Sequence, residues 1–177
     1  MNNPTVHNTS ITIPKKVLFA DENPGDIRVL SDRPDWVSLQ VACQLTSAAR
    51  AAESLRELLG DLSLEQQDQI ALAIRELLLN AVEHGGHLDT QKTVDLSLIR
   101  TERSIVCYIR DPGDGFSFSA LEHFATSNDS DQLFRQLEIR AEQGLRPGGL
   151  GLLLVRRVAD ELVYSAKGNE VMFIKYL

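Results

Sequence analysis

The sequence predicts an α+β fold, a two-layer α/β sandwich in which helices cover one face of a mixed, mainly antiparallel sheet. Three observations support this class. Apolar and polar residues alternate in several short segments, as they do in half-buried strands. Most of these segments are joined by connections short enough for hairpins, which favours antiparallel pairing. A helix packed on the sheet is indicated by apolar residues at helical period, namely Ile70, Ala73, Ile74, Leu77 and Ala81.

The first 34 residues are expected to form an N-terminal extension, and residues 35–177 to form a single domain. Residues 1–13 are rich in Asn and Thr, a composition typical of a loosely attached or disordered tail. Lys16–Ala20 has the apolar content of a short strand and leads into an acidic turn. We therefore expect the extension to be partly disordered.

The domain is expected to open with an alternating strand at Trp36–Cys43, followed by a helix. Thr46 or Ser47 is placed to cap this helix at its N-terminus. The helix is expected to run to Leu59, because Gly60 follows at the position where helices favour glycine.

The second helix is expected to begin at a capping box formed by Ser63 and Gln66 and to end at Gly85-Gly86. Two alternating segments follow, at Thr93–Arg100 and Ser104–Arg110. Only three residues separate them, so they are predicted to pair as a hairpin.

The rest of the chain contains a long polar connection, a helix and a closing hairpin. Residues 112–147 are polar and punctuated by glycine, with a short helix expected near 131–142. A connection of this length in a compact domain is typical of a functional lid or a mobile segment. A helix is then predicted at Leu150–Ala159, and the final hairpin pairs residues 162–166 with 171–177.

Composition excludes several classes of function. The chain has 177 residues, 43% of them hydrophobic, and a net charge of −7. An acidic chain without a basic run is not expected to bind nucleic acid or a membrane surface. Cys43 and Cys107 stand in apolar segments without zinc-ligand spacing, so both are expected to be buried free thiols. Since no apolar signal or membrane-spanning segment occurs, we expect a cytoplasmic protein.

The first motif with chemical meaning lies on the second predicted helix. Glu76 and Asn80 are one turn apart, so they share a face of this otherwise apolar helix, together with Glu83 and His84. An asparagine oxygen is a suitable ligand for magnesium, and a carboxylate one turn away can accept a proton. Taken alone, the same stripe is equally consistent with a solvated helix face.

The second motif, Asp111 with Gly113 and Gly115, follows the end of a predicted strand. A carboxylate there can accept a hydrogen bond from an adenine amine, and glycines allow the backbone to approach a base and ribose. Taken alone, this segment is better explained as a Pro-Gly turn in which the aspartate binds backbone N–H groups.

The third motif, Gly148-Gly149-Leu150-Gly151, opens a helix. Unpaired N–H groups and the positive end of the helix dipole favour phosphate at such a position. The motif lacks the Lys-Ser/Thr pair of a Walker A loop and the Rossmann spacing. The end of a flexible loop explains the glycines equally well, and Arg146 is either a phosphate ligand or a surface charge.

The three motifs occur together and in order, and they resemble the N, G1 and G2 boxes of the GHKL (Bergerat-fold) ATP-binding superfamily: Glu76-x-x-x-Asn80, Asp111-x-Gly113-x-Gly115 and Gly149-x-Gly151. The resemblance covers roughly residues 35–177. The first motif ends in His84-Gly85, which is most similar to the N box of bacterial anti-sigma-factor serine kinases.

This resemblance implies an ATP- and Mg²⁺-dependent serine/threonine-protein kinase. Asn80 would coordinate magnesium, Glu76 would be the general base, and Asp111 would bind adenine. The other ATP-binding residues that the resemblance implies are Gly113, Gly115, Arg146, Gly149, Leu150 and Gly151. The implied partners are a STAS-domain anti-anti-sigma protein, as phosphoacceptor, and a sigma factor, and such kinases tend to form homodimers.

The chain departs from the family pattern at two places. Pro147 and Gly148 precede the last glycine motif where the family often has Gly and then Arg or Met. Asn169 and Glu170 follow Gly168 where the family tends to have Gly-Thr. Two alternatives to the kinase therefore stay open: a nucleotide-binding or degenerate module that sequesters a regulatory partner, and a histidine-kinase-like ATPase domain.

Overall fold

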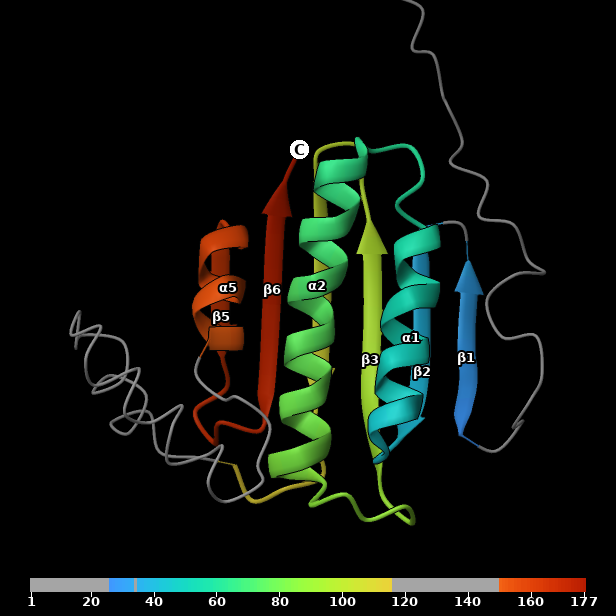
Figure 1. Cartoon of the computed structure of the whole chain (residues 1–177), viewed down its shortest axis with the longest axis vertical. Coiled ribbons are helices and arrows are strands. Elements are labelled where there is room, and N and C mark those ends of the chain that lie inside the picture. Colours follow the sequence, from blue (N-terminus) through green and yellow to red (C-terminus); the bar gives the residue numbers. More distant parts are fainter. Residues whose placement is uncertain (1–25, 34, 116–149) are drawn as a thin grey trace, which may run out of the picture.

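The computed structural model describes residues 26–33, 35–115 and 150–177. In this part of the chain a six-stranded sheet is covered on one face by three helices (Figure 1). Strands occur in the order β1-β2-β3-β4-β6-β5, and each neighbouring pair is antiparallel. The predicted α+β two-layer sandwich is confirmed, with an entirely antiparallel sheet among the described strands.

Most strand bounds agree closely with the alternation in the sequence. The strands are β1 (Ile27–Arg33), β2 (Trp36–Ala42), β3 (Thr93–Arg100), β4 (Ser104–Arg110), β5 (Glu161–Tyr164) and β6 (Glu170–Tyr176). The predicted hairpin of β3 and β4 is confirmed to the residue. Strand β1 was not predicted, and it pairs with β2 as an edge strand of the same sheet. The sheet therefore begins before residue 35, within the predicted extension.

Helix α1 (Leu45–Glu57) differs from the prediction at both ends. Gln44 occupies the N-cap and makes no side-chain capping bond. Ser47 is fully buried, and its hydroxyl has no hydrogen-bond partner among the described residues, so it faces the core rather than capping. At the other end, Leu58 N donates to Leu55 O, a tight three-residue bond that ends the helix before Gly60.

Helix α2 (Leu64–Asn80) begins as predicted, and the helical segment ends at Gly85-Gly86 as predicted, although its last turn is not α-helical. Ser63 and Gln66 form the capping box, in which each side chain receives a bond from the other residue's backbone N–H. The α-helix stops at Asn80 and continues as a π-helical turn, η1 (Ala81–Gly85), closed by Gly86 N donating to Ala81 O at 2.8 Å. This wide turn carries Gly85 to the end of the sheet.

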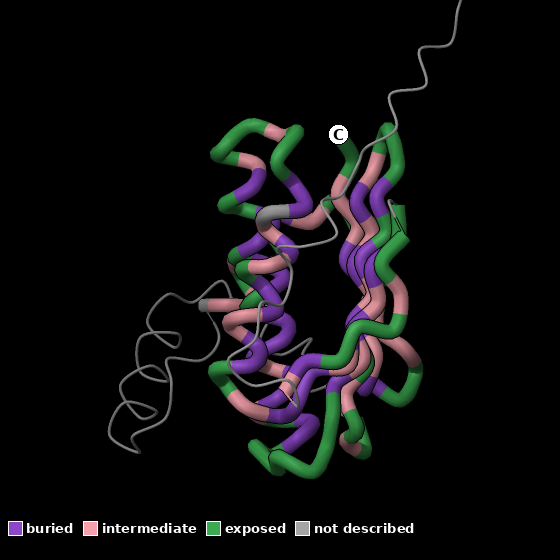
Figure 2. The backbone as a smooth tube through the Cα atoms, turned by 90° about the vertical axis from the view of Figure 1, so that its right-hand side faces the viewer, coloured by how far each residue is buried: buried purple, intermediate pink, exposed green. Residues whose placement is uncertain are grey.

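The hydrophobic core lies between the two layers, where buried residues of the helices face buried residues of the strands (Figure 2). The predicted apolar stripe of α2, from Ile70 to Ala81, is buried. On the sheet, Phe173 of β6 is among the largest fully buried side chains, and burial of such a side chain stabilises the fold by about 1.5–3 kcal/mol. The two free cysteines are buried as expected, and burial raises the pKa of both thiols.

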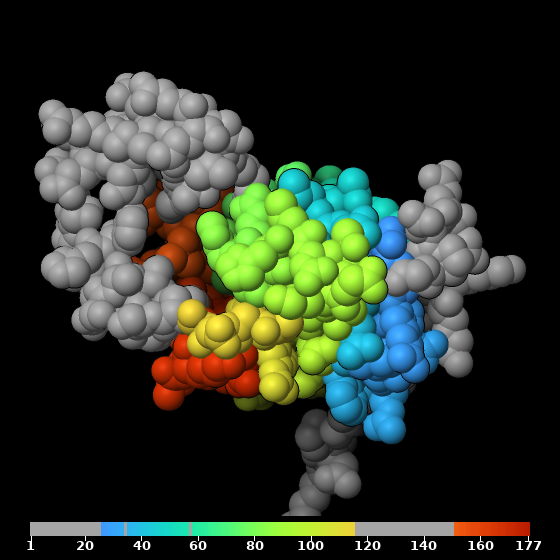
Figure 3. Space-filling view, turned by 90° about the horizontal axis from the view of Figure 1, so that it is seen from below, coloured from blue at the N-terminus to red at the C-terminus, as the bar shows by residue number. Residues whose placement is uncertain are grey.

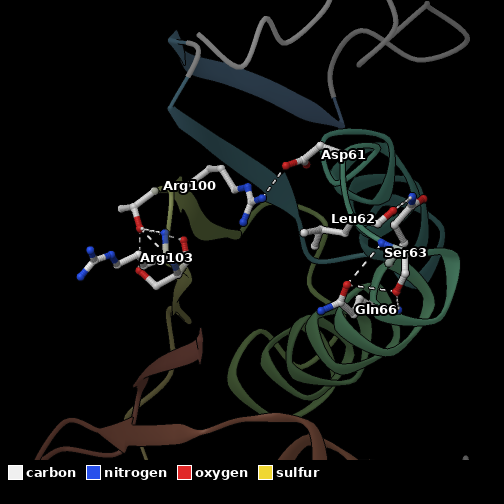
Figure 4. Close-up of polar contacts among 9 residues, drawn as sticks. Asp61, Leu62, Ser63, Gln66, Arg100 and Arg103 are labelled. Carbon is white, nitrogen blue, oxygen red and sulfur yellow. Dashed lines mark hydrogen bonds and ion pairs between the residues drawn. The ribbon is translucent and has the colours of Figure 1, made fainter. Parts of the chain in front are cut away.

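An ion pair between a buried arginine and an exposed aspartate joins the α1–α2 turn to the end of β3 (Figure 4). Arg100 is only 8% exposed, and its Nη2 lies 2.5 Å from Oδ2 of Asp61. Its Nε and Nη1 have no hydrogen-bond partner among the described residues. Asp61 is therefore the anion that compensates a guanidinium held almost completely out of water.

Helix α5 (Leu150–Val158) lies beside α2 and begins at the predicted position (Figure 1). Among the described residues, no helix has the length and apolar character needed to cross a membrane. The predicted strand at Lys16–Ala20 and the helix near 131–142 lie outside the described residues, as does most of the predicted 112–147 connection.

Candidate functional site

The end of α2 and the end of β4 meet at one pole of the molecule. Figure 3 views this pole, where the segment after α2 lies against the loop after β4. Gly85 packs directly on Asp111, because a Cβ built on Gly85 would lie 2.2 Å from Cγ and Oδ1 of that side chain. The first and second sequence motifs are therefore in contact, and this contact leaves room only for a glycine at position 85.

The Asp111 carboxylate is half-buried and partly hydrogen-bonded. Its Oδ1 accepts a 2.8 Å bond from Gly113 N, and this bond does not use Oδ2. Burial raises the pKa of Asp111, while the Gly113 N–H and the Lys167 ammonium oppose that rise. The side chain is thus an oriented acceptor for an N–H donor when ionised.

The glycines after Asp111 are required by close packing. A Cβ on Gly113 would lie 2.9 Å from Gly85 O, which is too near for any side chain. Gly115 has a φ of +82°, and its Cβ would lie 1.9 Å from Lys167 O. Both glycines predicted from the sequence therefore allow backbone segments to approach each other around Asp111.

The third motif meets the first on the helix side of the site. A Cβ built on Gly151 would lie 2.2 Å from Oε2 of Glu76, so the start of α5 packs on this carboxylate. Glu76 and Asn80 are both half-buried on α2. Leu150 opens α5, whereas Arg146 and Gly149 lie outside the described residues. Glycines of α5 and of the α2 end thus contact the two carboxylates that the sequence singled out.

An open pocket of about 310 Å³ is lined in part by Asp111, Gly113 and Asn169. Its walls include Asp95 and Arg110, which are paired across β3 and β4 and alternate with the buried core residues of those strands. These side chains face away from the helices, so Glu76 and Asn80 do not line this pocket.

Two residues of this region were not predicted as site residues. Asn169 is buried and bonds to the backbone of Asp111, and Lys167 Nζ donates to Gly113 O at 3.0 Å. The sequence offered one signal for Asn169, the departure from Gly-Thr after Gly168, and none for Lys167. Within the described ranges, no group of three His, Cys, Asp or Glu residues is arranged to hold a metal ion.

Comparison with known proteins identifies the family. A family model described as a histidine kinase-like ATPase domain matches residues 37–175. The chain belongs to this family. The match spans β2 to β6 and contains all three motifs, which confirms the GHKL resemblance drawn from Glu76, Asp111 and Gly151.

Similar curated proteins point to one branch of this family. Three proteins named serine-protein kinase RsbW, from Staphylococcus epidermidis and two of its strains, are each 28% identical to this chain over 118 residues. The aligned region covers 65% of this chain and 69% of each relative. A histidine kinase-like ATPase domain similar to serine-protein kinases is consistent with use of ATP.

Replacing Gly85 with alanine is expected to weaken ATP binding about tenfold, because the new methyl group would displace the Asp111 carboxylate. Titration calorimetry of ATP with magnesium measures this change. Gly60→Ala is the matched control, since Gly60 is exposed near the N-terminus of α2 and has no positive φ. Equal affinities in the two variants would show that the contact between Gly85 and Asp111 does not matter for binding.

Proposed function

We propose that the chain is an ATP-dependent serine/threonine-protein kinase of the anti-sigma-factor type. It phosphorylates a STAS-like anti-anti-sigma protein and thereby regulates a sigma factor. The observation that carries the proposal is the meeting of three motifs at one pole: Gly85 packs on Asp111, and Gly151 packs on Glu76. Similarity to serine-protein kinase RsbW supports the same conclusion.

The adenine base is bound by Asp111 in this proposal. Its carboxylate accepts a hydrogen bond from the exocyclic amine, and Gly113 and Gly115, whose close packing lets the loop fold around Asp111, lie beside the base. The backbone of Gly149, Leu150 and Gly151 holds phosphate oxygens at the start of α5. Arg146 pairs with a terminal phosphate.

Magnesium fits the donor set on α2. Asn80 is half-buried and supplies a neutral hard oxygen, and magnesium carried by a nucleotide needs only one or two protein ligands beside the phosphates. When bound, the ion neutralises charge on the transferring phosphoryl group. Asn80 is therefore the residue assigned to hold it.

Glu76 acts as the general base. The hydroxyl of a partner serine or threonine gives its proton to the Glu76 carboxylate as its oxygen bonds to the γ-phosphorus. The bond from that phosphorus to the β–γ bridging oxygen breaks, and ADP leaves with the electron pair. Packing of Gly151 against Glu76 limits the positions open to this side chain.

The test has a binding arm and a transfer arm. Titration calorimetry should show binding of ATP with magnesium to the wild type and sharply weaker binding to Asn80→Ala. Incubation with γ-labelled ATP and STAS-domain proteins of the source organism should then yield acid-stable phosphoserine or phosphothreonine. No ATP binding by the wild type would refute the nucleotide site, and acid-labile phosphohistidine would refute the serine/threonine assignment.

The proposal also places the protein in the cytoplasm, as a homodimer.

A further inference from the structure

The β5–β6 turn holds the loop that carries Asp111. Asn169 is 7% exposed and makes two bonds to Asp111: its backbone O accepts from Asp111 N at 3.0 Å, and its Nδ2 donates to Asp111 O at 3.3 Å. Both main-chain polar groups of Asp111 are thus bound by one residue that lies 58 positions later in the chain. These bonds continue the β4–β6 pairing one residue beyond Arg110 and Glu170.

The turn is itself firmly built. Gly168 has a φ of +81°, and its N–H donates to the backbone O of Ser165 at 2.9 Å. Ser165 N donates to Glu170 O at 3.0 Å, which closes the hairpin. Lys167 then reaches the Asp111 loop through its bond to Gly113 O. The turn therefore contacts the loop at two places, the Asp111 backbone and Gly113 O.

We propose that Asn169 is a positioning residue that fixes the orientation of the Asp111 carboxylate, and that preference for adenine over guanine nucleotides depends on it. This inference rests on the proposed ATP site. Two contacts restrain Asp111: Gly85 packs against its side chain, and Asn169 is hydrogen-bonded to its backbone. If the Asn169 amide is removed, Asp111 O loses a buried donor and the backbone that aims the carboxylate is less restrained.

Orientation decides selectivity because adenine and guanine present groups of opposite polarity at ring position 6. Adenine presents an N6 amine, which donates, and guanine presents O6, which accepts. An ionised carboxylate only accepts, so a fixed Asp111 binds the amine and repels O6. A carboxylate free to turn aside would lose the attraction and the repulsion together, so the affinities for ATP and GTP would converge.

The experiment is titration calorimetry of ATP and of GTP, each with magnesium, into the full chain. Asn169→Ala should weaken ATP binding roughly tenfold and lower the ATP/GTP affinity ratio by at least that factor, because GTP binding is expected to improve. Gln40→Ala is the matched control, because its side-chain amide donates to Asp95 Oδ1 at 3.1 Å near the same end of the sheet without contacting Asp111. This control should keep the wild-type ratio. Asn169→Ser, whose hydroxyl is shorter than the amide, is the second variant if Asn169→Ala does not fold.

The outcomes separate this inference from the proposed function. A wild type that binds neither nucleotide would overturn both. A wild type that prefers ATP, with the same ratio in the folded Asn169 variants, would overturn the role of Asn169 alone. A lowered melting temperature with an unchanged ratio would likewise assign Asn169 a purely structural role. A wild type that binds ATP and GTP equally would also refute the inference.

Discussion

Glu76→Gln is expected to lower the rate of phosphotransfer by about 10²–10⁴-fold while ATP binding changes little. Glutamine keeps the length of the side chain and its packing beneath Gly151, but it cannot accept the proton of an attacking hydroxyl. The expected loss is therefore confined to the chemical step. Single-turnover transfer from γ-labelled ATP to the protein acceptor measures the rate, and calorimetry measures binding.

Glu65→Gln is the matched control for this experiment. Glu65 is exposed in the first turn of the same helix, and its replacement by glutamine removes the same unit of charge. Its variant should transfer phosphate at the wild-type rate. Transfer at the wild-type rate by Glu76→Gln would contradict the base assignment, whereas absence of transfer by the wild type itself would favour the module that sequesters a partner.

Asp61→Ala is expected to lower the free energy of unfolding by about 1–3 kcal/mol. The variant leaves the Arg100 guanidinium buried without its anion, and two of its three nitrogens already lack partners among the described residues. The cost is kept to this range because the Asp61 side chain is 42% exposed and water can enter where it was. Urea unfolding of the full chain gives the difference.

Arg100→Met is the companion variant, and its expected effect is much smaller. Methionine fills the same space and carries no charge. Loss of the ion pair is therefore offset, because the cost of removing the Arg100 charge from water disappears as well. We expect unfolding free energy within about 1 kcal/mol of wild type, or above it. A larger loss from Arg100→Met than from Asp61→Ala would show that the pair stabilises the fold rather than merely compensating a buried cation.

The sequence predicts strands well where alternation is uninterrupted. Buried residues alternate with more exposed ones along the whole of strands β3 and β4, and both strands were predicted with the bounds that the structure has. Strand β1 has a register shift between Val29 and Ser31 and leaves Val29 and Leu30 exposed, so its pattern does not alternate. The helix cap at Ser47 failed for a different reason, because burial by tertiary packing outweighed local capping preference.

The site was predicted only as far as short motifs reach. Glu76, Asp111 and their glycines stand in local patterns whose chemistry can be inferred from residue type and spacing. Asn169 has no such pattern, because its role depends on β6 lying next to β4. The order of the strands decides which residue bonds to Asp111. That order depends on contacts between segments far apart in the chain.

The same strand order determines when the site can form during synthesis. Strand β4 can pair with β3 soon after translation, but its other edge can pair only after β6 has been synthesised. With 58 positions between Asp111 and Asn169, and a ribosome adding about 5–20 residues per second, that edge stays open for on the order of several seconds. An open strand edge can pair with a neighbouring nascent chain. The proposed nucleotide site is thus assembled late, after an interval in which aggregation competes with folding.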